Sequence, residues 1–190
     1  DPSAQEIREK LKERGVDEEG IVVEKERPTT QKTRVVAGHQ QVVRFDDESR
    51  RLLQPETIKK ISRYIQKQWD QFDAVIISDY GKGVITSELL NAIRELHYQK
   101  PKMISVDPKE RNMELYKGVT LITPNKKEAS FATGKTIETE EDLKEVGRKI
   151  LHYLQCENVV ITLGAEGMAV FKKDGEFLKI PTFAREVFDV

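Results

Sequence analysis

The sequence has little of what several large classes of protein require. It contains one cysteine, Cys156, so it cannot form an internal disulfide, which is typical of a reducing compartment such as the cytoplasm. No apolar run approaches the roughly 20 residues that a membrane-spanning helix needs. The formal net charge is -1, so no overall field attracts nucleic acid or an anionic membrane. We therefore expect a cytoplasmic protein with no nucleic-acid partner and no membrane partner.

Other absences narrow the chemistry further. The histidines have no metal-ligand spacing, so a zinc site is not expected. No G-x-G-x-x-G follows a predicted strand, which disfavours an NAD-binding domain. Cys156 is interpreted as a small buried apolar residue rather than a nucleophile. The chain begins Asp1-Pro2 without Met and without a signal-peptide pattern, so we expect a fragment or a processed product.

The first part of the sequence is β-rich. The spacing of Ile7 and Leu11 predicts a short helix over 4–14, and residues 21–23 read as a strand. Two further β-rich runs, 33–36 and 41–45, are separated by a plausible hairpin connection. We expect these strands to form a small sheet apart from the rest.

After Pro55 the pattern becomes alternating strand and helix. Helical spacing begins at Ile58, and four short apolar runs then predict strands that are buried on both faces of a parallel sheet, at 74–77, 103–106, 119–122 and 159–162. Helical patterns lie between them, with Thr86 or Ser87 as one N-cap and Thr139 with Asp142 as a capping box. Two β-runs joined by a turn follow Gly167. This alternation indicates right-handed βαβ units, and so an α/β protein with an open, mostly parallel, Rossmann-like sheet and helices on both faces.

Polar and glycine residues follow each apolar run. Because ligands bind beyond the carboxyl ends of strands in such sheets, we expect a site formed by the segments 78–83, 107–109, 123–128 and 163–167. Each segment has a plainer explanation as well. The glycines after Asp79 make a tight turn without any ligand, and 164–167 suits an ordinary hairpin loop.

Asn125 and Glu128 also have two interpretations. They are spaced as a helix N-cap and its partner three residues on. A capped helix N-terminus is equally a place where a phosphate binds, and Glu128 could then hold a hydrated Mg²⁺. In the β-rich part, Lys32, Arg34, Arg44 and Asp46 alternate with apolar residues. They form either a solvated strand face or the polar face of a lid that closes on an anion.

In order along the chain, the motifs S-D-Y-G-K-G, V-D-P-K, T-P-N-x-x-E, T-L-G-x-x-G and A-R-E-V-F-D-V resemble those of the ribokinase-like, PfkB-type carbohydrate kinases. The stretch from Lys32 to Asp46, together with S-D-Y-G-K-G, is similar to the heptose-7-phosphate kinases of ADP-heptose synthesis. The resemblance runs from about residue 1 to residue 190 and implies a ribokinase-like fold with a small β lid. It implies a lid segment at 1–47 and a nucleotide- and sugar-binding core at 48–190 that is incomplete at its C-terminus.

The resemblance also implies roles for particular residues. ATP and Mg²⁺ would be bound by Asn125, Lys126, Lys127, Glu128, Thr162, Gly164 and Gly167, with Glu128 reaching the metal through water. The sugar phosphate would be bound by Arg34, Arg44, Asp79, Lys82 and Lys109. In the family the catalytic base lies in a G-A-G-D motif expected beyond Val190, so we name no catalytic residue and expect these 190 residues alone to be inactive.

The function expected from this resemblance is ATP-dependent phosphorylation of the anomeric hydroxyl of heptose 7-phosphate, which gives the 1,7-bisphosphate for lipopolysaccharide core precursors. The alternatives are another ribokinase-like sugar or nucleoside kinase and a non-catalytic nucleotide-binding module. Because exposed strand edges seek partners, the lid could also join two copies in a homodimer.

Overall fold

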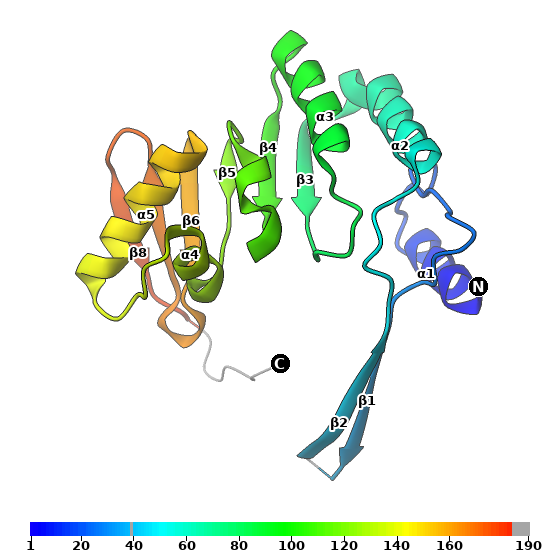
Figure 1. The fold of residues 1–190 in the computed structure, drawn as a ribbon, viewed down its shortest axis with the longest axis horizontal. Helices are drawn as coiled ribbons and strands as arrows, with labels where there is room; N and C mark the ends of the chain where they lie inside the picture. Colours follow the sequence, from blue (N-terminus) through cyan, green and yellow to red (C-terminus); the bar gives the residue numbers. More distant parts are fainter. Residues whose placement is uncertain (39, 184–190) are drawn as a thin grey trace. The chain divides into compact units, whose positions relative to one another are not determined.

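The computed structural model describes residues 1–38 and 40–183, and every structural statement below concerns those residues. They form two compact units, one of Asp1–Asp70 with Lys82–Ile93 and the other of Gln71–Gly81 with Arg94–Val190. Each unit is described by itself (Figure 1). The division into a lid at 1–47 and a core at 48–190 stays a prediction.

The first unit carries two helices and a hairpin. Helix α1 (Pro2–Glu13) begins where the Asp1 carboxylate accepts a hydrogen bond of 2.9 Å from the Ala4 amide, an N-cap. Helix α2 (Pro55–Gln68) has proline at its first position, where a missing amide hydrogen costs nothing, and it continues into the 3-10 turn η1 (Trp69–Gln71). The predicted strand at 21–23 is wrong, because this segment pairs with no strand and runs as irregular backbone.

The predicted hairpin is confirmed. Strands β1 (Gln31–Ala37) and β2 (Gln40–Asp47) pair antiparallel as a separate two-stranded sheet, hereafter the ribbon. The pairing places Arg34 opposite Arg44 and Val35 opposite Val43, and a register shift follows Val35. All of its described residues are exposed. Because side chains alternate along a strand, one face of the ribbon carries Lys32, Arg34, Arg44 and Asp46, and the other carries Val35, Val43 and Phe45.

The second unit is built on a six-stranded sheet in the order β3-β4-β5-β6-β7-β8. The first four strands are parallel and the last two are antiparallel, as the sequence predicts. The strands span Ala74–Ser78 (β3), Met103–Asp107 (β4), Leu121–Ile122 (β5), Asn158–Thr162 (β6), Met168–Lys172 (β7) and Phe177–Ile180 (β8). Only two residues of the run 119–122 pair as a strand.

Helices and 3-10 segments connect these strands. They are α3 (Ser87–Gln99), η2 (Glu110–Tyr116), α4 (Lys126–Thr133), α5 (Glu140–Leu154) and η3 (Gly164–Glu166). The predicted caps are confirmed, since the Thr86 hydroxyl accepts from the Leu89 amide and Thr139 forms a capping box with Asp142. Helix α4 ends at Gly134 with φ +67°, a left-handed conformation that glycine adopts without steric cost. The predicted α/β class is borne out, with a mostly parallel sheet and helices.

Burial of the sheet alternates along the strands. The buried face carries Ile77, Ile104, Val106, Ile122, Val159, Ile161, Ala169 and Phe171, each at most 5% exposed. Helix α5 packs on β6 and β7, and Gly147 makes this possible because a Cβ there would lie 2.5 Å from the Phe171 ring. The opposite face is less covered, with Ile76 at 79% exposure. Burial on both faces was therefore predicted wrongly for β3, and the helices of this unit cover one face of the sheet better than the other.

Within the described ranges, no helix is both long and apolar enough to cross a membrane.

Candidate functional site

The four parallel strands deliver their following loops to one edge of the sheet, hereafter the rim. Backbone hydrogen bonds connect neighbouring strand ends there: the Asp79 amide donates to the Asp107 carbonyl at 2.9 Å, and the Thr162 amide donates to the Pro124 carbonyl at 3.0 Å. Asn125 and Thr162 form an isolated parallel bridge. The rim thus brings together the predicted residues Asp79, Lys109, Asn125, Lys126, Lys127, Glu128, Thr162, Gly164 and Gly167, all within the second unit.

Asn125 and Glu128 form the capping box that begins α4. The Asn125 side-chain oxygen accepts from the Glu128 amide at 2.9 Å, and the Glu128 Oε2 accepts from the Asn125 amide at 3.0 Å. Glu128 is only 4% exposed, so its carboxylate is fixed rather than free to rotate. The structural interpretation of this pair is confirmed. It leaves the binding interpretation open, because the first amides of α4 and the helix dipole still favour an anion at this end.

Lys109 lies beside this box and connects it to the end of β4. Its Nζ donates to Glu128 Oε1 at 2.9 Å, and this bond raises the pKa of the Lys109 amine. Burial raises the pKa of the Asp107 carboxyl, and the neighbouring Glu128 charge raises it further while Lys109 opposes the rise. Within the described residues, Lys109 therefore forms its ion pair with Glu128 of α4 and not with Asp107.

Asp79 is the most enclosed carboxylate of the rim after Glu128, at 5% exposure. Its Oδ1 accepts from the Gly81 amide at 2.7 Å, and its Oδ2 accepts from Asn112 Nδ2 at 2.7 Å and from the Tyr116 hydroxyl at 2.7 Å. Gly81 has φ +65°, so the tight-turn interpretation is confirmed. Binding of a sugar hydroxyl by Asp79 stays a prediction, in which one acceptor position of its roughly four remains open.

The two glycines after β6 differ in what they permit. Gly167 has φ +93°, and a Cβ there would lie 2.0 Å from the Ile180 carbonyl oxygen, so its loop packs tightly against the end of β8. Gly164 has φ +60° with nothing within 4 Å of its Cβ position, so a flat ligand has room to approach that backbone. The loop interpretation holds for both residues, and only Gly164 has space for a nucleotide.

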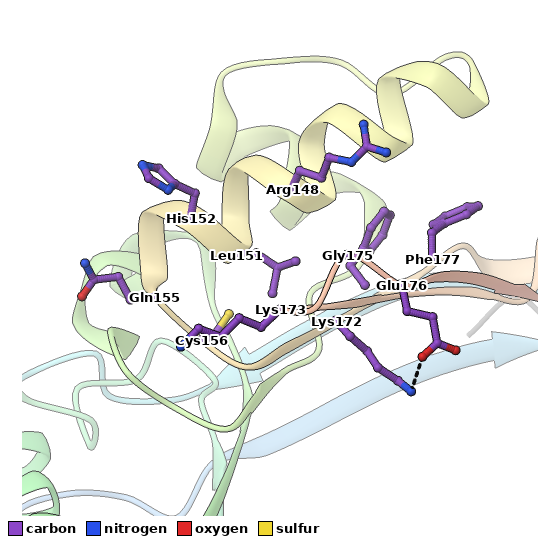
Figure 2. A pocket seen from close by; sticks show the side chains of 11 residues that line it. Arg148, Leu151, His152, Gln155, Cys156, Lys172, Lys173, Gly175, Glu176 and Phe177 are labelled. Atoms are coloured by element: carbon purple, nitrogen blue, oxygen red, sulfur yellow. Dashed lines mark hydrogen bonds and ion pairs between the residues drawn. The ribbon is translucent and has the colours of Figure 1, made fainter.

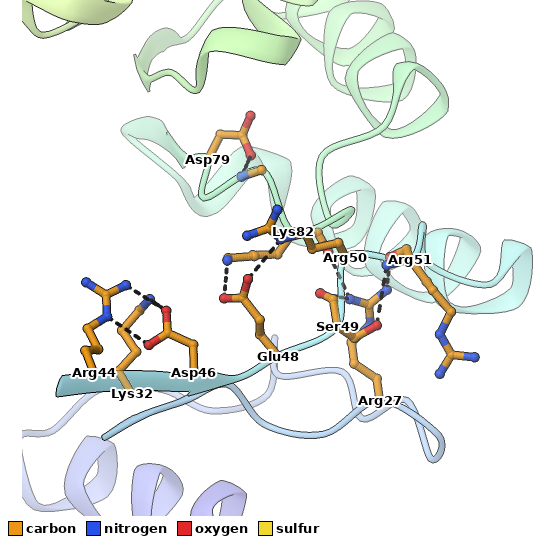
Figure 3. A network of polar contacts seen from close by, with 11 residues as sticks. Arg27, Lys32, Arg44, Asp46, Glu48, Ser49, Arg50, Arg51, Asp79 and Lys82 are labelled. Carbon is orange, nitrogen blue, oxygen red and sulfur yellow. Dashed lines mark hydrogen bonds and ion pairs between the residues drawn. The ribbon is translucent and has the colours of Figure 1, made fainter. Parts of the chain in front are cut away.

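Lys82 belongs to the first unit. Its Nζ donates to the Glu48 carboxylate, which also accepts from Arg50 Nε at 2.9 Å (Figure 3). These two cations, Lys82 first, hold the pKa of Glu48 below its usual range. In the structure, the anion beside Lys82 is thus the Glu48 carboxylate at the base of the ribbon. Binding of a sugar phosphate by Lys82 stays a prediction.

The charged face of the ribbon has more cations than anions. Asp46 accepts two hydrogen bonds from Arg44, of 2.8 and 2.6 Å, and one of 3.1 Å from Lys32 (Figure 3). Arg34 lies directly opposite Arg44 in register and has no ion-pair partner within the described part of the chain. Like charges placed opposite each other destabilise a ribbon, and an anion bound between them would remove that cost.

The base of the ribbon is held by Arg27, which sequence reasoning missed. Its guanidinium donates to the backbone carbonyls of Ser49, Arg51 and Lys82 (Figure 3). It also donates to Glu24 Oε2 at 2.8 Å. The Glu24 carboxylate also accepts from the Gln54 amide at 2.7 Å. The Arg27 hydrogen bond, the Gln54 amide and Thr57 together lower the pKa of Glu24 to about 2.

Asn112 and Tyr116 on η2 were also missed. They lie four residues apart and carry no motif, so only a three-dimensional arrangement brings them to Asp79. A buried carboxylate needs hydrogen-bond donors, so side chains such as these could be sought once Asp79 is known to be buried. The sequence alone does not show that burial.

One hollow of about 650 Å³ lies away from the rim, between α5 and the β7–β8 hairpin (Figure 2). Arg148 and His152 on α5 and Lys173 on the hairpin line it, as does Cys156. Cys156 is 1% exposed and burial raises its pKa to about 11, which confirms it as a buried, unreactive thiol. Because these residues precede β6 and follow β7, the hollow lies at the edge of the sheet opposite the rim and contains none of the predicted site residues.

The fold and the rim define an α/β protein whose candidate site combines a capped helix N-terminus, a fixed acidic residue and an open glycine loop. The pfkB family carbohydrate kinase profile matches residues 1–190, so the chain belongs to the pfkB family of carbohydrate kinases.

Curated relatives support the same family. A protein named Bifunctional protein HldE from Desulfatibacillum aliphaticivorans is 43% identical over 181 residues, which cover 95% of this chain and 37% of the relative. Another of that name from Geobacter metallireducens is 43% identical over 177 residues, covering 93% of this chain and 36% of the relative. The chain therefore spans a little over a third of the length of these relatives.

Solved structures show the same fold. Phosphofructokinase-2 from Escherichia coli in complex with potassium matches with a TM-score of 0.75 and 17% identity, over 96% of this chain and 59% of that one. Ribokinase from Giardia lamblia matches with a TM-score of 0.74 and 16% identity, over 98% of this chain and 57% of that one. The predicted ribokinase-like fold is therefore confirmed.

The Glu24–Arg27 contact predicts a pH-dependent stability. Because the pKa of Glu24 in the folded protein, about 2, lies below its ordinary value of 4.5, its stabilising effect is complete above about pH 4.5 and is lost as the pH falls toward 2. Glu24→Gln should lower the free energy of unfolding at pH 7 by about 1–3 kcal/mol. Chemical denaturation from pH 7 to pH 2 measures both quantities.

Glu26→Gln is the matched control, because the Glu26 side chain is exposed and makes no hydrogen bond or ion pair within the described ranges, so it should change stability little. A gap between wild type and Glu24→Gln that stays constant down to pH 2 would contradict the assignment.

Proposed function

We propose that this chain is part of an ATP-dependent kinase that phosphorylates the anomeric hydroxyl of heptose 7-phosphate, giving the 1,7-bisphosphate used for ADP-heptose and lipopolysaccharide core precursors. The observation that carries the proposal is the 43% identity over 95% of the chain to a protein named Bifunctional protein HldE. The rim supports the proposal, because its helix N-terminus and open glycine loop suit a nucleoside triphosphate and its Asp79 carboxylate suits a sugar hydroxyl.

The ATP side of the proposed site is the N-terminus of α4. The first amides of α4, beyond those used by the capping box, would face the phosphates, and Lys126 and Lys127 are exposed beside them. Gly164 would let the base or ribose approach the backbone beyond β6. Thr162, at the end of β6, and Gly167, which closes the loop, would support that surface from below.

A magnesium ion also fits this side. The Glu128 carboxylate has about four acceptor positions, and two are taken by the Asn125 amide and Lys109, so a metal-bound water could use another. No group of three or more His, Cys, Asp or Glu side chains in residues 1–38 and 40–183 is arranged to hold a metal by itself. The ion would therefore depend on ATP for most of its ligands and would offset the charge of the phosphates.

The sugar phosphate would be bound by cations. Arg34 and Arg44 on the ribbon present planar forks that suit the oxygens of a phosphate group, and Asp46 orients Arg44 through two hydrogen bonds. Lys82 would exchange Glu48 for the substrate anion. Asp79 and Lys109 would lie near the acceptor hydroxyl, with Lys109 also close to Glu128.

The catalytic base is proposed to lie outside this sequence. In the family pattern the base belongs to the G-A-G-D motif that follows Val190, and residues 184–190 lie outside the described part of the chain. In the rest of the mechanism, the chain positions the two substrates and excludes water, which is most of the work in phosphoryl transfer.

We further propose that the protein is cytoplasmic and that the ribbon joins two copies. An isolated two-stranded sheet is at best marginally stable in water, and the ribbon exposes Val35, Val43 and Phe45 at 44%, 48% and 58% on one face. A second ribbon packed on this face would cover it.

The test of the proposed function is a turnover assay with a protein whose sequence continues past Val190. With MgATP, kcat/KM for heptose 7-phosphate should exceed that for ribose, fructose 6-phosphate and a nucleoside by about 100-fold or more. The 190-residue chain by itself should show no turnover. Preference for one of the other acceptors would instead support a different ribokinase-like kinase. MgATP binding by calorimetry without any turnover would support a non-catalytic module.

The ribbon arginines should act on the sugar phosphate. Arg34→Gln and Arg44→Gln should each raise the KM for heptose 7-phosphate by about tenfold or more, because each removes charge-assisted bonds to the phosphate. The matched control is Arg63→Gln, since Arg63 is exposed on α2 of the same unit and makes no ion pair within the described residues. Steady-state kinetics measure the effect, and an unchanged KM in both ribbon variants would exclude them from substrate binding.

The apolar face of the ribbon should control assembly. Phe45→Lys should convert a dimer to a monomer, because it places a charge in the proposed interface. Val42→Lys is the control, since Val42 is 63% exposed and alternates to the opposite face of the ribbon. Sedimentation velocity distinguishes the two states, and a Phe45→Lys protein that remains dimeric would rule out this face as the interface.

A further inference from the structure

Tyr116 and Asn112, which belong to no sequence motif, bond to Asp79 on the side of the rim proposed to bind the acceptor sugar. Tyr116 has 0% exposure, and its hydroxyl donates to Asp79 Oδ2 at 2.7 Å. Burial and the bond to Asp79 raise the pKa of the Tyr116 hydroxyl far above its ordinary value, so it remains a donor at all working pH values. Asn112 Nδ2 donates to the same oxygen at 2.7 Å. The second unit thus supplies both donors from one short segment, η2.

The other oxygen of Asp79 shapes the turn that follows. Oδ1 accepts from the Gly81 amide at 2.7 Å, and the Asp79 amide donates to the Asp107 carbonyl at 2.9 Å. Since Gly81 has φ +65°, the turn depends on this hydrogen bond and on a residue without a Cβ. The orientation of the turn therefore depends on the direction of the Asp79 carboxylate, which Tyr116 and Asn112 set.

A carboxylate is an expensive way to make such a turn. Asparagine or serine at position 79 would form the same backbone contact without burying a charge. A charged group at the rim that is 5% exposed and is held by three donors is instead typical of a group that is orientated for a ligand.

The ATP side is held independently. A Cβ added at Gly81 would lie 3.2 Å from Lys109 Cγ, so the turn passes close to the Lys109 side chain but shares no hydrogen bond with it. Lys109, Asn125 and Glu128 are joined among themselves by hydrogen bonds of 2.9 to 3.0 Å. Loss of the bonds from Tyr116 and Asn112 to Asp79 should therefore disturb the turn at Gly81 strongly, and should disturb the capping box of Asn125 and Glu128 much less.

We infer that Tyr116 and Asn112 are positioning residues, which orient the Asp79 carboxylate and the turn at Gly81 for the acceptor sugar. The kinetic part of this inference rests on the proposed function, and the structural part does not. Neither residue touches a reacting atom in this arrangement, so both act through Asp79.

The main variant is Tyr116→Phe, which keeps the buried ring and removes only the hydroxyl. Tyr153→Phe is the matched control, because the Tyr153 hydroxyl bonds to Glu114 of the same segment, η2, and not to Asp79. In the 190-residue chain, amide hydrogen exchange at Gly81 should be about tenfold faster in Tyr116→Phe and unchanged in Tyr153→Phe. Amide exchange at Glu128 should remain within about twofold of wild type in both, as its own capping box predicts.

Asn112→Ala should change exchange at Gly81 in the same direction as Tyr116→Phe. Each substitution is tested by itself, so the result does not depend on whether a protein carrying both substitutions folds. Unchanged exchange at Gly81 in both single variants, or an equal change in Tyr153→Phe, would overturn the positioning role.

The kinetic readout uses a protein whose sequence continues past Val190. Tyr116→Phe should raise the KM for the acceptor sugar phosphate by about tenfold, while the Kd for MgATP from calorimetry stays within about twofold. An unchanged acceptor KM, or an equal loss of affinity for both substrates, would overturn the inference. If wild type phosphorylates no sugar, the proposed function fails, and exchange at Gly81 alone decides whether Tyr116 and Asn112 position the turn.

Discussion

The parallel pairing of β3, β4, β5 and β6 is the constraint on which the candidate site depends. Each of these strands runs in the same direction, so the residue after each one must emerge at the same edge. This is why Asp79, Lys109, Asn125 and Gly164 are neighbours at the rim although up to 85 residues separate them along the chain. Reversing a single strand would move its loop to the edge where Arg148 and Lys173 line a separate hollow.

The rim and the ribbon differ in their balance of charge, and this difference suits the two proposed substrates. At the rim, the carboxylates Asp79, Asp107 and Glu128 are balanced by Lys109, Lys126 and Lys127, and burial with the Glu128 charge raises the pKa of Asp107. A triphosphate would bind such a balanced site more readily as its magnesium complex. On the ribbon, Arg34 and Arg44 with Lys32 outnumber Asp46, which suits an uncomplexed sugar phosphate.

Local and periodic features could be predicted from the sequence, and features set by burial could not. The capping box at Asn125 and the alternation of apolar runs depend on spacing, which the sequence displays. The strand expected at 21–23 failed because three β-branched residues do not form a strand without a partner edge. Three residues, Asn112, Tyr116 and Arg27, escaped prediction because each bonds to a group far along the chain. Their roles appear only once the fold brings Asp79 and the Arg51 carbonyl next to them.

Most cations predicted to bind substrate are already paired within the chain. Lys82 bonds to Glu48, Lys109 to Glu128 and Arg44 to Asp46. A phosphate must therefore replace or share a carboxylate rather than bind a bare charge, so its net affinity reflects the difference between two similar interactions. Arg34 is different, because it faces Arg44 and has no ion-pair partner in the described residues. An anion there gains a contact without breaking one, which makes Arg34 the group from which substrate selectivity on the ribbon would arise.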